Sequence, residues 1–233
     1  MRYNDIHAAT FIRRVNRFVA EVEVDGTVER VHVKNTGRCA ELLVPGYTVW
    51  LERSGNPARR TAFDLVGVEK PAAGGGTRYV NMDSMAPNRA AGEWLAAGGL
   101  GPLENLRSEV TVVDSRFDFV AEERGRPVAV EVKGCTLEAG GVAKFPDAPT
   151  LRGLKHVRGL ARLAGEGWRC ALLVVIQMKG AEVFTPNWDT QPEFGRALIE
   201  AREKGVEIVA MDCLARPGEV VIDQAVRVEL GKF

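Results

Sequence analysis

The chain has 233 residues, of which 45% are hydrophobic and 27% are charged, and its 31 basic and 31 acidic residues give a formal net charge of zero. This composition is typical of a globular protein with a sizeable core, and the length suits one large or two small domains. The zero charge excludes a uniformly basic surface, so a nucleic-acid partner would have to be met by local positive patches.

Neither a membrane span nor a zinc site is expected from this sequence. No apolar run approaches the roughly 20 residues of a membrane span, and the first residues do not form a secretory signal. The four cysteines are far apart, and none belongs to a C-x-x-C pair. We therefore predict a cytoplasmic protein with reduced core cysteines, no zinc site and no membrane partner.

The first third of the chain is predicted to be rich in β-strands. Phe18 to Val24 alternates apolar and acidic residues, and Asp25-Gly26 after it is a strong hairpin signal. Further short strands are expected at 28–33, 47–52 and 63–68. Closely spaced short strands predict a small barrel, of which an OB-like barrel is one option. The glycine-rich stretch 72–76 is a loop or linker, so we divide the chain into domains 1–80 and 81–233.

The remainder has the pattern of a mixed sheet covered by helices. A helix is expected after Ser84, with Pro87 in its first turn and Gly98-Gly99 at its end. Two more helices are predicted at 150–163 and 192–204, and strands at 110–113, 117–121, 128–133, 171–177 and 206–211.

Three charged residues in the predicted strands indicate a catalytic site. Glu131 and Lys133 are two residues apart and therefore share one face of a strand, while Asp118 lies on the preceding strand across a short turn. Two carboxylates side by side repel each other, and a hard divalent cation relieves that repulsion. A metal ion beside a lysine is suited to phosphodiester hydrolysis, although an isolated triplet of this kind is more often a surface salt-bridge cluster.

The spacing Asp118…Glu131-X-Lys133 resembles the catalytic core of the PD-(D/E)XK nuclease superfamily. The surrounding segments resemble the sugar fermentation stimulation protein A family at 35–38, 45–46, 87–89, 115–119, 130–137, 145–150 and 152–156. The resemblance covers the chain from about Arg17 to Cys213. It implies an α+β/α/β architecture, in which an OB-like β-barrel is followed by a PD-(D/E)XK nuclease-like mixed sheet flanked by helices.

The same resemblance implies roles for individual residues. Asp118 and Glu131 would bind Mg²⁺ or Mn²⁺, and Lys133 would be the catalytic lysine. Glu109 would be a further metal ligand supplied just before the first strand of the sheet, or else a solvated carboxylate. Gln177 would be an accessory polar residue near the site, or simply the polar end of a strand.

Other residues are proposed from their local context. Asp147 lies in a proline-rich turn, and it either only shapes that turn or also approaches the metal. Arg152, Lys155 and His156 lie on a helix with no acidic residue before Glu166, which is either a solvated face or a contact for the phosphate backbone. Arg38, in the barrel domain, is a further candidate for nucleic-acid binding.

Two functions follow from these residues and from the resemblance. The first is a metal-dependent nuclease acting on DNA, RNA or both, with no small-molecule cofactor beyond the metal. The second is a non-catalytic DNA-binding transcriptional regulator of sugar (maltose) metabolism, as the family has been described. Strandedness, sequence preference, oligomeric state and the choice between internal and terminal cleavage are left open.

Overall fold

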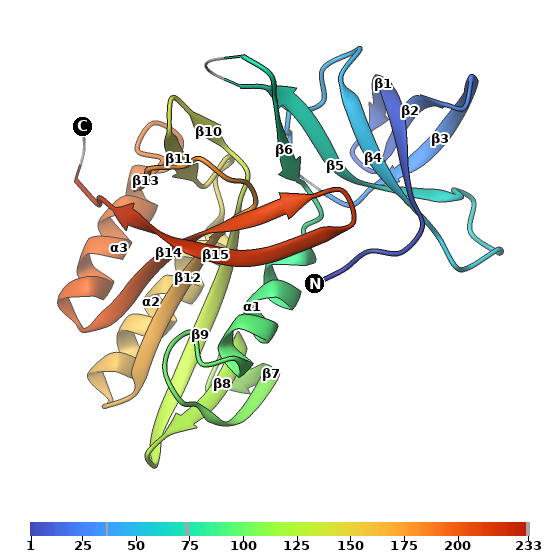
Figure 1. The fold of residues 1–233 in the computed structure, drawn as a ribbon. Helices are drawn as coiled ribbons and strands as arrows, with labels where there is room; N and C mark the ends of the chain where they lie inside the picture. The colour runs from blue at the N-terminus through green and yellow to red at the C-terminus, as the bar shows by residue number, and fades with distance from the viewer. Residues whose placement is uncertain (36, 73–74, 232–233) are drawn as a thin grey trace.

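In the computed structural model, which describes residues 1–35, 37–72 and 75–231, the chain forms a β-barrel joined to a mixed sheet covered by helices (Figure 1). The barrel domain consists of the strands β1 (Ile6–Asn16), β2 (Val19–Val24), β3 (Thr27–Val33), β4 (Thr48–Arg53), β5 (Phe63–Pro71) and β6 (Thr77–Asn81). Their order is β3-β2-β1-β4-β5-β6, and a parallel pairing of β3 with β5 closes the first five strands into a barrel. The predicted OB-like domain is thus confirmed.

The alternation of apolar and polar residues explains the barrel. Ala20, Val22 and Val24 of β2 are buried, and the predicted hairpin turn has both Asp25 and Gly26 at positive φ, which glycine adopts without steric cost. The strands β1 and β6 were not predicted from the sequence. Part of the glycine-rich loop predicted at 72–76 lies outside the described residues.

The second sheet has nine strands in the order β10-β11-β13-β15-β14-β12-β9-β8-β7. These are β7 (Glu104–Val112), β8 (Ser115–Glu123), β9 (Arg126–Cys135), β10 (Glu138–Ala139), β11 (Val142–Phe145), β12 (Arg169–Ile176), β13 (Val183–Pro186), β14 (Val206–Arg216) and β15 (Glu219–Val228). The central strand β12 runs parallel to both β9 and β14, while β7, β8 and β9 form an antiparallel meander. Every residue of β12 after its first is buried, as expected for a strand covered on both faces.

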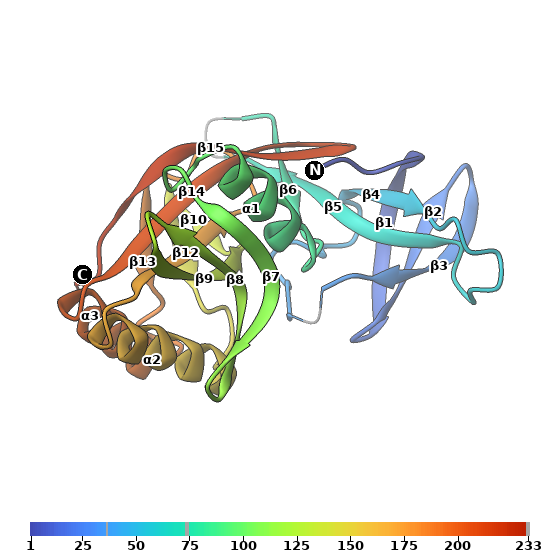
Figure 2. The same cartoon turned by 90° about the horizontal axis from the view of Figure 1, so that it is seen from below.

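Helices cover both faces of this sheet (Figure 2). They are α1 (Ala86–Ala96) on one face, and α2 (Leu151–Gly165) and α3 (Pro192–Glu203) on the other. Thr150 caps α2 by accepting a hydrogen bond from the Gly153 N–H. The three predicted helices are confirmed to within a few residues.

Specific polar contacts join the two domains, beside apolar residues of both domains that share the same buried clusters. Glu138 of β10 forms ion pairs with Lys70 and Arg78 of the barrel domain, at 2.9 and 2.7 Å. The buried amide of Gln177 donates to the side-chain and main-chain oxygens of Asn81 and to the main-chain oxygen of Asp83. The short connection between β6 and α1 is therefore fixed against the end of β12.

All four cysteines are buried and free, as predicted. Among the helices of the described residues, none has the length and apolar character needed to cross a bilayer.

Candidate metal and nucleic-acid site

The hairpin of β8 and β9 brings the two predicted carboxylates together. Phe119 pairs with Val130 in the antiparallel register, so Asp118 lies beside Glu131. One oxygen of Asp118 accepts a hydrogen bond from Asn88 of α1 at 2.7 Å, and the other accepts from the Val132 N–H at 2.7 Å. Asp118 is therefore held in place from two elements of the fold.

The two carboxylate oxygens of Glu131 differ in their hydrogen-bond partners. It is 1% exposed, and its Oε1 contacts both the Lys133 ammonium and Nδ1 of His156. Its Oε2 is buried and has no hydrogen-bond partner among the described residues. A buried carboxylate oxygen without a partner is costly, and a positively charged ligand is one group that could satisfy it.

The two carboxylates also differ in their ionisation. Burial raises the pKa of Asp118, and the neighbouring Glu131 carboxylate adds to that rise. Burial opposes ionisation of Glu131 as well, but the hydrogen bond from His156 and the charge of Lys133 outweigh it and lower the pKa of Glu131. The surroundings therefore shift the pKa values of the two neighbouring carboxylates in opposite directions.

The residues present fit a hard divalent cation. Magnesium and manganese take oxygen ligands, and magnesium is commonly bound by one or two carboxylates together with waters and substrate oxygens. Asp118 and the unpartnered oxygen of Glu131 supply this donor set. Among the described residues no group of three His, Cys, Asp or Glu side chains is arranged to hold a metal.

Glu109 does not occupy the position predicted for it. It lies within β7 instead of before the first strand, at a positive φ of 57°, and its exposed carboxylate pairs with Arg116 at 2.9 Å. Glu109 lines a shallow cavity that also contacts Asp118, but within the described part of the chain it does not join the Asp118–Glu131 pair. Its role as a metal ligand remains a prediction.

Comparisons with known proteins identify the family. Residues 12–82 match the SfsA N-terminal OB domain, and residues 85–219 match the sugar fermentation stimulation protein RE domain. The sugar fermentation stimulation protein homologs of Desulfitobacterium hafniense and Ruminiclostridium cellulolyticum are 46% and 45% identical, over 99% of this chain and 99% and 100% of theirs. The chain belongs to the sugar fermentation stimulation protein family.

A solved structure of this family has the same fold. It is the SfsA of Pyrococcus furiosus in complex with Ca²⁺, which is 28% identical and covers 98% of each chain with a TM-score of 0.86. The resemblance inferred from sequence motifs is thereby confirmed at the level of the family.

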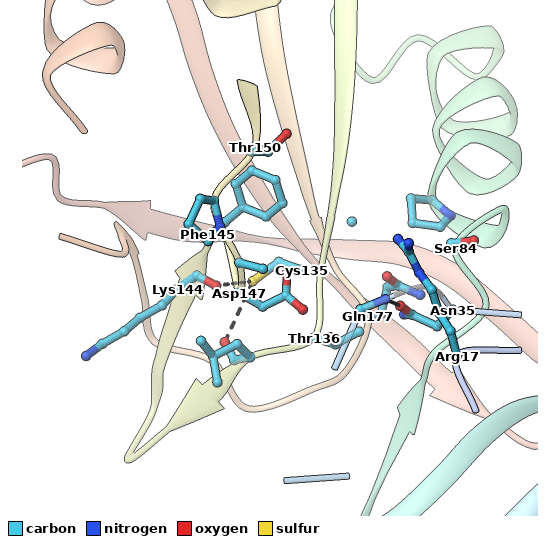
Figure 3. A pocket seen from close by; sticks show the side chains of 16 residues that line it. Arg17, Asn35, Ser84, Cys135, Thr136, Lys144, Phe145, Asp147, Thr150 and Gln177 are labelled. Carbon is cyan, nitrogen blue, oxygen red and sulfur yellow. Dashed lines mark hydrogen bonds between the residues drawn. The ribbon is translucent and has the colours of Figure 1, made fainter. Parts of the chain in front are cut away.

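Gln177 and Asp147 line a cavity of about 360 Å³ between the two domains (Figure 3). Its wall includes Gly134, which follows Lys133 on β9, and Pro87, which precedes Asn88 on α1, but neither Asp118 nor Glu131 lines it. Gln177 is buried where β12 ends, whereas Asp147 is an exposed turn residue. Neither Gln177 nor Asp147 shares a described hydrogen bond with Asp118 or Glu131, so their accessory role remains a prediction.

The residues predicted to bind nucleic acid fall into two groups. Arg38, Arg152 and Lys155 are exposed, and Lys155 donates to the main-chain oxygen of Asp114 at 2.8 Å. His156 is buried against Glu131, so its side chain is not on the surface that a phosphate backbone would meet. The structure therefore places His156 inside the site.

Two members of the site were not assigned to it from the sequence. His156 occupies the buried face of α2 with Val157 and Leu160, a position that helical spacing from the apolar residues would have indicated. Asn88 follows the N-terminal proline of α1 and lies in the segment 87–89 that resembles the family, but no role of its own was predicted for it from the sequence.

Proposed function

We propose that this protein is a metal-dependent nuclease that hydrolyses phosphodiester bonds in DNA, RNA or both, with Mg²⁺ or Mn²⁺ as its metal. The observation that carries the proposal is the buried pair of Asp118 and Glu131, in which one carboxylate oxygen has no partner among the described residues and a lysine lies alongside. This is the chemistry of the PD-(D/E)XK nucleases, to which we assign the second domain.

Each residue has a defined task in this proposal. Asp118 and Glu131 would hold the cation, which when bound supplies charge stabilisation and an activated water. Asn88 fixes Asp118 from α1. The side chain of Lys133 is 14% exposed and contacts Glu131, a position from which it can hold a phosphate oxygen or orient an attacking water.

The Pyrococcus furiosus SfsA was solved in complex with Ca²⁺, which supports a divalent site in the family. Ca²⁺ prefers carboxylate and carbonyl oxygens, as Mg²⁺ does, and differs mainly in its larger and more flexible coordination shell. The proposal takes Asp118 and Glu131 as the corresponding ligands in this chain.

The barrel would bind the substrate strand beside the site, together with the exposed basic side chains of α2. Arg152 and Arg158 lie on the solvent face of that helix, and none of the ion pairs among the described residues involves them. Lys155 and Arg162 are partly neutralised by Asp114. The positive patch is local, in keeping with a chain of zero net charge.

The proposal is tested by incubating the full-length protein with labelled single- and double-stranded DNA and RNA in Mg²⁺, Mn²⁺ or EDTA. We expect cleavage that requires the metal and is lost in Glu131→Gln and Lys133→Met. Glu207→Gln is a matched control, because Glu207 lies on β14 and pairs with Arg169, outside the β8–β9 hairpin.

The result that overturns the proposal is intact substrate with every metal while the wild-type protein still retards DNA on a gel. In that case the protein binds without turnover, as expected of a non-catalytic transcriptional regulator of sugar (maltose) metabolism.

A further inference from the structure

The cavity between the domains has the size and chemistry of a pocket for one unpaired nucleobase. Its volume of about 360 Å³ lies in the range of pockets that enclose a small organic group. A stacked duplex cannot enter a space of this size, whereas a base turned out of its stack can. The walls come from both domains, with Asn35 on the barrel side and Phe145 on the other (Figure 3).

Most polar groups in this cavity are already engaged. The amide of Asn35 bonds the Gly37 N–H and the Met82 carbonyl oxygen. The Ser84 hydroxyl donates to the Lys34 carbonyl oxygen, and the Thr150 hydroxyl accepts the Gly153 N–H. These groups shape the wall and leave little capacity for a ligand.

Two acceptors remain. Gln177 is 2% exposed and uses its Nε2 for three oxygens of the interdomain connection, so its Oε1 faces Gly134 without a hydrogen bond from any described residue. A Cβ at Gly134 would approach this oxygen to 2.6 Å, so glycine is required to keep it accessible to the cavity. The carboxylate of Asp147 has no hydrogen bond or ion pair within the described part of the chain, and one of its oxygens lies close to Gly37 of the barrel domain. In Figure 3 it lies across the cavity from Gln177.

The remaining groups that line the cavity also suit an unpaired nucleobase. The Thr136 hydroxyl has no hydrogen bond among the described residues, while Phe145 and Pro87 offer apolar surfaces. Lys144 extends away from the cavity, and Arg17 lies on the barrel wall beside Asn35, opposite Asp147 (Figure 3). Gln177 and Asp147 thus offer acceptors to the cavity that no described residue occupies, and Thr136 offers a hydroxyl.

We propose that this cavity, which we call the base pocket, binds an unpaired base carrying an exocyclic amino group on the nucleotide next to the scissile phosphate. An amino group has two N–H donors, and Asp147 with Gln177 supplies two acceptors for them. Cytosine is bound, whereas uracil presents a carbonyl oxygen at the same position and is disfavoured. The inference rests on the proposed nuclease function, in which Lys133, the residue before Gly134 on β9, would hold the phosphate.

The test compares two single-stranded DNA oligonucleotides, oligo(dC) and oligo(dU), at pH 8. The two bases differ in the amino group and the adjacent ring proton. Binding to the full-length Lys133→Met variant is measured by fluorescence anisotropy, and cleavage is measured with the wild-type protein in Mg²⁺. We expect oligo(dC) to be preferred by about tenfold or more in both assays, since a hydrogen bond to a charged acceptor is lost with uracil.

The variant Asp147→Asn, combined with Lys133→Met for the binding assay, identifies the pocket. Asparagine offers donors as well as an acceptor, so the preference for oligo(dC) should fall to less than about threefold. Asp189→Asn removes an equivalent exposed carboxylate outside the pocket and should leave the preference unchanged.

Equal binding and equal cleavage of the two oligonucleotides by the unmodified pocket would overturn the base pocket while leaving the nuclease proposal standing. A preference that survives Asp147→Asn would also overturn it. Selective binding of oligo(dC) without cleavage of any substrate would support the pocket and remove the nuclease proposal instead.

Discussion

Two buried glutamates of this molecule differ in the partners that their carboxylate oxygens have. Glu138, at the contact between the domains, has Lys70 and Arg78 on one oxygen and the Gly141 N–H at 2.8 Å on the other. Glu131 has Lys133 and His156 on Oε1 and, among the described residues, no partner on Oε2. In the first arrangement both carboxylate oxygens have partners, whereas in the second one oxygen has no described partner and is the atom to which we propose that the metal binds.

The largest effect should be on catalysis, at the incomplete site alone. Lys133→Met removes the partly exposed ammonium that contacts Glu131, so we expect cleavage to fall by about a thousandfold. Single-turnover cleavage in Mg²⁺ measures this change. Glu138→Gln is the matched control and should retain activity within about threefold. An equal loss of cleavage activity in both variants would show that the two glutamates do not differ in function.

Stability, in contrast to catalysis, should depend on the contacts of Glu138. Glu138→Gln keeps the size of the side chain but loses the charge that holds Lys70 and Arg78, which should lower the free energy of unfolding by about 2 kcal/mol. Urea denaturation followed by circular dichroism measures the change. A loss below about 0.5 kcal/mol would mean that this contact does not hold the domains together.

The same contact should make stability depend on pH. Burial raises the pKa of Glu138. The hydrogen bond from Lys70, together with weaker interactions, outweighs this effect and holds the pKa below its usual 4.5. Its stabilising contribution is present above about pH 4.5 and is lost as the pH falls through the lower value of the folded state. Thermal unfolding should therefore show the difference between wild type and Glu138→Gln shrinking below about pH 4.5. A difference that stays constant down to about pH 3 would contradict this assignment.

At the incomplete site, removing a carboxylate should stabilise the metal-free fold. Asp118→Asn relieves repulsion with Glu131, and Asn88 can reverse its amide to keep a hydrogen bond, so we expect a gain of about 1 kcal/mol in EDTA. Mg²⁺ or Mn²⁺ should raise the melting temperature of the wild type and not that of the variant. Destabilisation in EDTA would show that Asp118 is a structural residue.

The smallest effect is expected on binding at the surface. Arg152→Gln should weaken the binding of single-stranded DNA by a factor of about three and reduce its dependence on salt, because one phosphate contact is lost. Fluorescence anisotropy at several salt concentrations measures both quantities. Lys155→Gln is the comparison, because the contacts of Lys155 with Asp114 should make its effect smaller. A larger loss in Lys155→Gln than in Arg152→Gln would contradict this ranking.

Local patterns predicted the strands and helices with clear periodicity, and failed where pairing depends on distant segments. The irregular register of β1, with shifts near Arg13 and Asn16, obscures its alternation, so this strand was not predicted. β15 does alternate, with Val220 and Ile222 buried, but its antiparallel pairing with β14 was not predicted either. Tyr3 lies near β15, with its N–H donating to the Gly218 carbonyl oxygen, a contact that no nearby residue could indicate.

The sequence predicted the strand residues at the centre of the candidate site, but not the helix residues that contact them. Asp118, Glu131 and Lys133 follow from face-sharing on a hairpin, which is a local property of strands. The contacts of Asn88 and His156 come from helices that pack on the sheet, so they depend on tertiary structure. Glu109 was misplaced because β7 begins at Glu104, several residues earlier than its apolar residues indicated.

The unpartnered oxygen of Glu131 is the atom to which we assign the metal. Titration calorimetry with Mn²⁺ on the full-length wild type, Glu131→Gln and Glu138→Gln tests this assignment most directly. We predict one bound ion in the wild type and in Glu138→Gln, and binding weakened by about a hundredfold or more in Glu131→Gln, since a charged ligand is lost. Unchanged Mn²⁺ affinity in Glu131→Gln, in a protein that remains folded, would contradict the assignment.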